Sequence, residues 1–147
     1  MPKAEDPQAP VEGAVEELLQ ATGLLLRRLR TEASGDNLTW SQTVVLGQLS
    51  KQGPATTADL ARVEAVTPQS MSATLGVLEE QGLVERRQHP TDGRQILFAL
   101  TKEGQATREA RSRLKRTWLS SALAHLTQAE LRALLAAAGP MKKLANS

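Results

Sequence analysis

The stretch Ala55–Val84, "ATTADLARVEAVTPQSMSATLGVLEEQGLV", has the pattern of two short helices joined by a tight link. Thr56 stands where it can cap the first helix. Thr67 and Pro68 give the second helix an N-cap and a proline in its first turn. Gly82 fits the position just beyond the end of that helix. Two capped helices joined by about three or four residues form a helix-turn-helix.

The second helix has two different faces. Met71, Leu75 and Leu78 recur at helical spacing and predict a buried face, and Leu60 and Val63 are expected to point inward from the first helix. The opposite face of the second helix carries small, mostly neutral groups, where a solvated helix usually shows Lys and Glu: Gln69, Ser70, Ser72, Ala73 and Gly76. Such groups fit against base edges in a major groove, although an ordinary polar face of a small helical domain is the alternative.

A β-hairpin is predicted next, because "LVERRQ" and "QILFALT" flank the turn-forming residues of "HPTDGR". A helix-turn-helix followed by a hairpin is a winged helix. At the tip, Arg94 can enter a minor groove, Gly93 lets the backbone approach closely, and Asp92 can turn the loop and hold Arg94. The alternative is a surface ion pair between Asp92 and Arg94 that only stabilises the turn. Arg86 and Arg87 lie at the base of the wing, within reach of phosphates.

Helices are predicted on both sides of this winged helix. Residues 11–33 carry an apolar stripe at helical spacing. The segment after Leu38 opens with the capping-box spacing of Thr39 and Gln42, and Val45, Leu46 and Leu49 give it an apolar face that is expected to point inward. Thr101 is expected to cap a long helix. Thr127 and Glu130 form a second capping box that opens the last helix, which Gly139-Pro140 should kink or interrupt. The predicted fold is therefore mainly α, with one small β-hairpin.

Composition narrows the function classes. Of the 147 residues, 40% are apolar and 2% aromatic, so one domain with an aliphatic core is expected. The absence of cysteine excludes disulfides, thiolate metal sites and a cysteine redox sensor. No apolar run has the length of a membrane span, and the N-terminus has no signal-peptide core, so a cytoplasmic protein without a membrane partner is predicted.

Charge and motifs argue against catalysis. Net charge is only +2, but residues 84–116 hold nine basic and four acidic side chains, a possible nucleic-acid footprint. The alternative is a solvated helix face. There are two histidines, and no HExxH, GxSxG or phosphate-binding glycine loop is present. The sequence therefore predicts neither an enzyme, nor a metal site, nor a cofactor.

At this point the sequence resembles the MarR family of bacterial transcription regulators. The resemblance covers residues 38–116 closely and the terminal helices in layout only. It rests on "LTWSQ", "TTADLA", "VTPQSMSATLGVLEEQGLVERR" and above all "HPTDGRQILFALTKEG", in that order.

The resemblance implies a homodimeric winged helix that binds a pseudo-palindromic operator in double-stranded DNA. It divides the chain into a flexible tail (1–10) and one domain (11–147). Dimerisation helices (11–33 and 117–147) hold a DNA-binding lobe (38–101) through a linking helix (102–116). Major-groove contacts are then expected from Pro68, Gln69, Ser70, Ser72, Ala73 and Thr74. The wing contacts would come from Asp92, Gly93 and Arg94, and the phosphate contacts from Thr56, Thr57, Arg86 and Arg87.

Two residues depart from the family pattern. Ala73 stands where many members carry Arg, so a strong contact to DNA is missing there. His89 stands where many wings begin with Asp, and its protonation is expected to strengthen phosphate attraction at lower pH, unless it is simply a loop residue.

An effector is also implied, commonly an anionic aromatic or lipophilic compound, bound between dimer helices and lobe. Its binding would favour a lobe spacing that does not match the operator. Arg30, Trp40 and Arg87 are candidates because they combine cations with an aromatic wall. In the alternative, Trp40 is core and the arginines are solvated. The predicted function is a ligand-responsive repressor, the other possibility being a protein-interaction module that does not read DNA.

Overall fold

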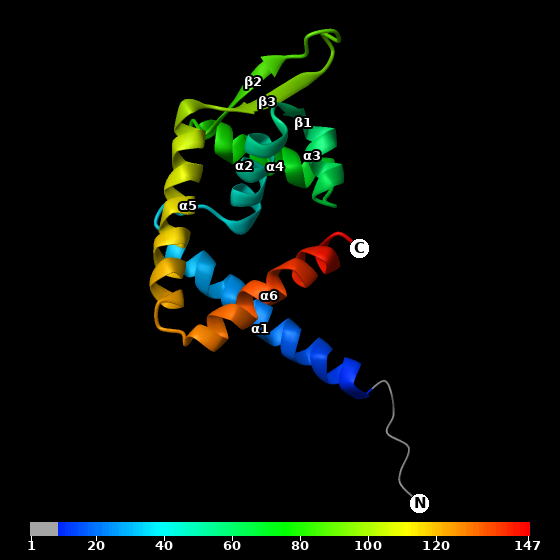
Figure 1. The fold of residues 1–147 in the computed structure, drawn as a ribbon. Coiled ribbons are helices and arrows are strands. Elements are labelled where there is room, and N and C mark those ends of the chain that lie inside the picture. The colour runs from blue at the N-terminus through cyan, green and yellow to red at the C-terminus, as the bar shows by residue number, and fades with distance from the viewer. Residues whose placement is uncertain (1–8) are drawn as a thin grey trace, which may run out of the picture. The chain divides into compact units, whose positions relative to one another are not determined.

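The computed structural model describes residues 9–147, which divide into two compact units. The winged unit comprises residues 34–113, and the flanking unit comprises the described residues up to Ala33 together with residues 114–147. The elements (Figure 1) are α1 (Ala9–Ala33), α2 (Trp40–Gln52), β1 (Ala55–Thr56), α3 (Thr57–Val63), α4 (Pro68–Glu80), β2 (Val84–Gln88), β3 (Ile96–Leu100), α5 (Lys102–Leu123) and α6 (Gln128–Ala145). The fold is mainly helical with a small antiparallel sheet, as predicted.

The winged unit has an almost wholly aliphatic core. It joins one face each of α2, α3 and α4 to the sheet, and Phe98 is its single aromatic residue. The predicted inward residues of α2 and α4 are all buried: Val45, Leu46, Leu49, Met71, Leu75 and Leu78. The prediction for Val63 is wrong, since this side chain is 58% exposed. Helix α3 buries Leu60 and Ala61, and Val63, two residues further on, points to another side of the helix.

The sheet has three strands in the order β1-β3-β2, one more than the predicted hairpin. Strands β2 and β3 pair in antiparallel register from Val84 opposite Leu100 to Gln88 opposite Ile96. The added strand, β1, places Ala55 opposite Phe98 on the other edge of β3. Through this pairing the residues directly before α3 are attached to the wing.

Local hydrogen bonds set the ends of the helices as predicted. Thr39 and Thr127 form complete capping boxes, and Thr67 accepts a bond from the backbone N–H of Ser70. The bonds from Thr127 lower the pKa of the Glu130 carboxyl below its usual range. Helix α4 ends with two overlapping bonds, from Gly82 N to Glu79 O and from Leu83 N to Leu78 O, and Gly82 has a φ of 72°. This geometry turns the chain from α4 directly into β2.

The flanking unit differs from the winged unit in its burial. Helix α6 has no buried residue, and between residues 11 and 33 only Ala33 of α1 is buried. Large apolar side chains are exposed along both helices, among them Val11, Val15, Leu18, Leu19, Leu134, Leu135 and Leu144. Within the unit, the Arg28 guanidinium lies 5.5 Å from the centre of the Trp118 ring. Two helices with such apolar faces need a further surface to cover them.

Two expectations about the terminal segments require correction. Helix α1 begins at Ala9, so residues 9 and 10 belong to a helix and not to a flexible tail, while residues 1–8 lie outside the described residues. Helix α6 runs through Pro140 without interruption. No helix within residues 9–147 combines the length and the apolar character that crossing a membrane requires.

Candidate nucleic-acid interface

The N-terminal half of α4 presents a neutral, exposed surface. Pro68, Gln69, Ser70, Ser72 and Ala73 are exposed, and Thr74 is half-buried. The Thr74 hydroxyl donates a hydrogen bond to the backbone carbonyl of Ser70 at 3.2 Å, so its proton is used within the helix. Met71, Leu75 and Leu78 anchor the opposite face in the core. The buried face thus holds α4 against the core, and the opposite face of its first two turns is accessible to a partner.

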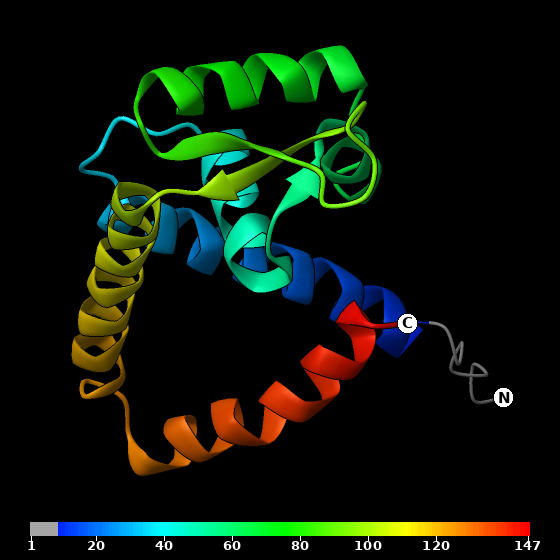
Figure 2. The same ribbon diagram turned by 90° about the horizontal axis from the view of Figure 1, so that it is seen from above.

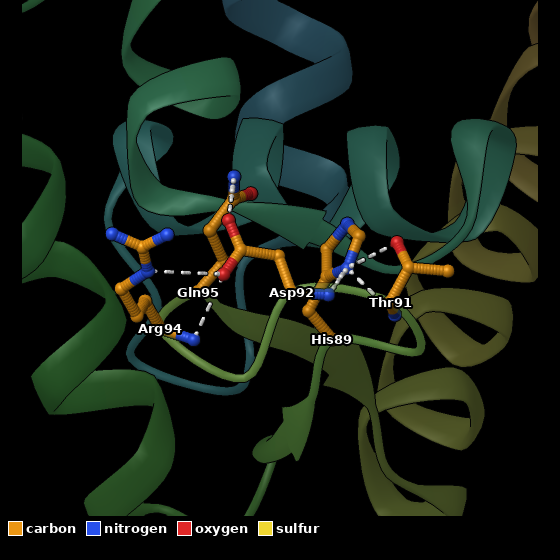
Figure 3. Close-up of polar contacts among 5 residues, drawn as sticks. All are labelled: His89, Thr91, Asp92, Arg94 and Gln95. Carbon is orange, nitrogen blue, oxygen red and sulfur yellow. Dashed lines mark hydrogen bonds and ion pairs between the residues drawn. The ribbon is translucent and has the colours of Figure 1, made fainter.

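The wing tip, His89–Gln95, is an ordered loop organised by its own side chains (Figure 3). Asp92 Oδ1 accepts a bond from the backbone N–H of Arg94 at 3.1 Å, and Asp92 Oδ2 accepts one from Gln95 Nε2 at 3.2 Å. The Arg94 guanidinium is 3.7 Å from Asp92 Oδ1, yet its side chain is 96% exposed. Asp92 therefore shapes the loop, as predicted, while the Arg94 guanidinium projects into solvent.

The two arginines at the wing base have acidic partners. Arg86 Nε donates to Glu79 Oε2 at 2.9 Å, which ties β2 to the neighbouring α4 (Figure 2), and its guanidinium lies 5.4 Å from the centre of the Phe98 ring. Arg87 makes two bonds to one oxygen of Glu85. Exposed ion pairs of this kind contribute at most about 1 kcal/mol. A phosphate could therefore replace the acidic partner at little cost.

Thr56 and Thr57 lie where α3 begins. The Thr56 hydroxyl accepts the backbone N–H of Asp59 at 3.1 Å, as its predicted capping role requires. A shallow groove beside them is lined by both threonines, Asp59 and, from the wing, Arg94 and Ile96. The β1–β3 pairing, which the sequence did not reveal, brings these two segments to one groove.

The residues suggested for an effector border two different cavities or lie on α1. Trp40 is 49% exposed and lies outside the core. It borders a cavity of about 220 Å³ between α2 and α4, with Val44, Glu64, Val66, Ser70 and Thr74 among the other lining residues. Arg87 borders a different cavity, beside Pro54 and Gln105. Arg30 lies on α1, in the flanking unit. The winged unit thus keeps Trp40 and Arg87 apart.

Comparison with known proteins identifies the family. A model described as "MarR family" matches residues 36–95, which include the helix-turn-helix, β2 and the wing tip. A protein named HTH-type transcriptional repressor Rv2887, from Mycobacterium tuberculosis, is 34% identical over 116 residues, which cover 78% of this chain and 84% of the relative. The chain belongs to the MarR family.

Solved structures agree with this MarR assignment. The crystal structure of Rv1404 from Mycobacterium tuberculosis has a TM-score of 0.84 and 27% identity, and the match covers 98% of this chain and 97% of that one. A mutant of MepR from S. aureus, solved bound to an oligodeoxyribonucleotide, has a TM-score of 0.69 over 88% of this chain and 96% of its own. At 20% identity that second likeness bears on the fold alone.

Proposed function

We propose that this MarR-family chain is a homodimeric, sequence-specific repressor that binds a pseudo-palindromic operator in double-stranded DNA. The observation that carries the proposal is the combination, within the winged unit, of a neutral, open first half of α4 and a projecting Arg94. A helix with small polar side chains can enter a major groove, and a guanidinium fits a narrow minor groove. A relative named as a transcriptional repressor supports repression as the activity.

In this proposal each predicted site residue has a place on the DNA. Helix α4 reads bases through Gln69, Ser70 and Ser72, with Pro68, Ala73 and Thr74 packed against the groove. The wing reads the minor groove through Arg94, which Asp92 and Gly93 position. Phosphates are contacted by Thr56 and Thr57 at the start of α3, and by Arg86 and Arg87 once they exchange their carboxylate partners for phosphate.

The flanking unit supports the homodimer. Its exposed apolar side chains on α1 and α6 would be covered by a second copy of the same helices. Burying apolar area contributes about 25 cal/mol per Å², so an interface along two helices stabilises a permanent dimer. Two-fold symmetry would also place two α4 helices about one DNA turn apart. Sedimentation equilibrium of the full chain at micromolar concentration is expected to give twice the chain mass.

Release by a small effector, an anionic aromatic or lipophilic compound, completes the proposal. Such a compound acts if it binds more tightly to a lobe arrangement that does not match the operator. Trp40 and Arg87 border two different cavities of the winged unit, so neither of these cavities offers both the aromatic wall and the cation. A compound screen against the operator complex is therefore a better route to the effector than these residues.

Selection of bound duplexes from a random DNA pool, at two salt concentrations, tests the proposal. Enrichment of an inverted repeat with half-sites one turn apart is expected, with affinity that falls steeply as salt rises because counterions are released from phosphates. Binding without enrichment at either salt would mean that the winged helix does not read sequence. A salt-insensitive, mostly apolar association with a protein would favour the interaction-module alternative.

Replacing Gln69 by alanine is expected to change the preference for particular bases more than the salt dependence of DNA affinity. Gln69 is exposed at the start of α4, where one amide can pair with one adenine. Repeating the selection with Gln69→Ala should relax one position in each half-site, at a cost of about 1 kcal/mol, and leave the salt slope unchanged. Glu80→Ala, at the other end of α4, serves as control. A flattened salt slope with unchanged preference would show that Gln69 does not lie against the bases.

A further inference from the structure

The wing tip begins with a histidine that acts as a hydrogen-bond acceptor. His89 Nδ1 lies 3.2 Å from the backbone nitrogen of Thr91 and 3.1 Å from that of Asp92 (Figure 3). Backbone N–H groups can only donate, so Nδ1 must be unprotonated to accept both bonds. In a neutral ring that makes these bonds, the proton resides on Nε2.

These two bonds cap the loop. Acceptance from the N–H groups two and three residues further along is the pattern by which Asp and Asn organise turns. The bond from the Asp92 backbone N–H to His89 holds Asp92 in position. The Asp92 carboxylate in turn accepts bonds from the backbone N–H of Arg94 and from the side-chain amide of Gln95. The loop is closed by bonds from His89 N to Gln95 O and from Gln95 N to Asp92 O. His89 is thus the first member of a series of contacts that ends at Arg94.

The charged groups around the tip are few. Asp92 and Arg94 belong to the loop itself, and Asp59, paired with Arg62 on α3, borders the groove beside Arg94. Gln88, which precedes the loop on β2, and Gln95, the last residue of the loop, are neutral. Histidine is the one side-chain type among these that ordinarily changes its charge between pH 5 and 8.

We propose that neutral His89 is a positioning residue that holds the wing tip in its DNA-binding conformation, and that its protonation releases the tip. When Nδ1 carries a proton it can no longer accept a hydrogen bond. Its N–H group then faces the backbone N–H groups of Thr91 and Asp92, which are also donors. Operator affinity therefore falls as the pH is lowered, the opposite of the sign expected if protonation only added a charge near phosphate. The effect on operator affinity rests on the proposed function, whereas the cap itself does not.

The free protein provides the first test, by NMR between pH 8 and pH 5. The amide signals of Thr91 and Asp92 are expected to move together with the His89 ring signals, and their protection from hydrogen exchange to fall about tenfold. His89→Asn keeps an acceptor at the same position without titrating, so its loop amides should stay unchanged. His125→Asn alters the second histidine, which bonds to Ser121 O, and should behave like the wild type. Amides that ignore the His89 titration, or a His89 ring that does not titrate in this range, overturn the proposal.

The second test uses the duplex enriched from the random pool, at about 0.3 M salt, where a single added charge is largely screened. Affinity is expected to fall roughly tenfold between pH 7.5 and pH 5.5 for the wild type and for the control His125→Asn, and to stay level for His89→Asn. Tighter binding at low pH, or an equal fall in His89→Asn, overturns it. If the pool yields no duplex, the proposed function fails, and the amide measurements still decide the role of His89.

Discussion

Replacing Gly104 by alanine is expected to lower the free energy of unfolding by about 2 to 3 kcal/mol, through overpacking. Gly104 is buried in the first turn of α5, where a Cβ atom would lie 2.0 Å from the carbonyl oxygen of Leu83 and 3.2 Å from Leu100 Cδ2. The Leu83 carbonyl cannot move aside, because it accepts the backbone N–H of Thr101 and follows directly after the turn at Gly82. Helix α5 would have to move away from the sheet.

Gly76→Ala is the matched control for this substitution. Gly76 lies in the middle of α4, and apart from its chain neighbours and the adjacent helix backbone, no heavy atom of the described residues comes within 4 Å of a Cβ added there. Alanine should raise stability by about 0.5 to 1 kcal/mol, as in an ordinary helix interior. Chemical denaturation at equal protein concentration measures both variants. Shifts of the same sign would contradict the close approach of α5 to Leu83.

Replacing Arg94 by alanine is expected to weaken specific DNA binding by about 1 to 3 kcal/mol, roughly 5- to 150-fold. The guanidinium is 96% exposed at the wing tip, and its ion pair with Asp92 is long, so little folding energy is lost with it. The unfolding transition should therefore stay within about 0.5 kcal/mol of the wild type. Binding is measured on the selected duplex, and unfolding by denaturation.

Two further variants show whether the contact is specific. Arg116→Ala removes another exposed arginine, from α5, and should change affinity much less. Arg94→Lys keeps the charge but loses the planar fork, and is expected to recover only part of the affinity. An unchanged affinity in Arg94→Ala would remove the wing from the mechanism. An equal loss in Arg116→Ala would indicate a general effect of charge.

Contacts that span three or four residues could be predicted from the sequence. Thr39, Thr67, Thr101 and Thr127 each accept the N–H three residues ahead, because the cap depends on the local backbone alone. The inward faces of α2 and α4 followed from helical periodicity for the same reason. The turn at Asp92 was also predictable from the sequence, since the bonds of its carboxylate reach only Arg94 and Gln95, two and three residues further on.

Contacts between distant segments were not predictable in the same way. Strand β1 is two residues long and exists only because Ala55 and Thr56 find Phe98 and Leu97 on β3. The exposure of Val63 and Trp40 depends on which surfaces α3 and α2 turn toward the core. The position of the His89 ring beside the backbone nitrogens of Thr91 and Asp92 depends on how the loop folds, which residue type alone does not reveal.

By itself, the sequence determined the order of helices and hairpin, the caps that begin α2 to α6, and membership of a winged-helix family, because spacing and residue type act over a few neighbouring residues. Only the tertiary structure decided that β1 ties the start of α3 to the wing, and that Gly104 must lack a side chain against Leu83. Those features depend on segments far apart in the chain, which meet once the core has formed and closed the intervening loops.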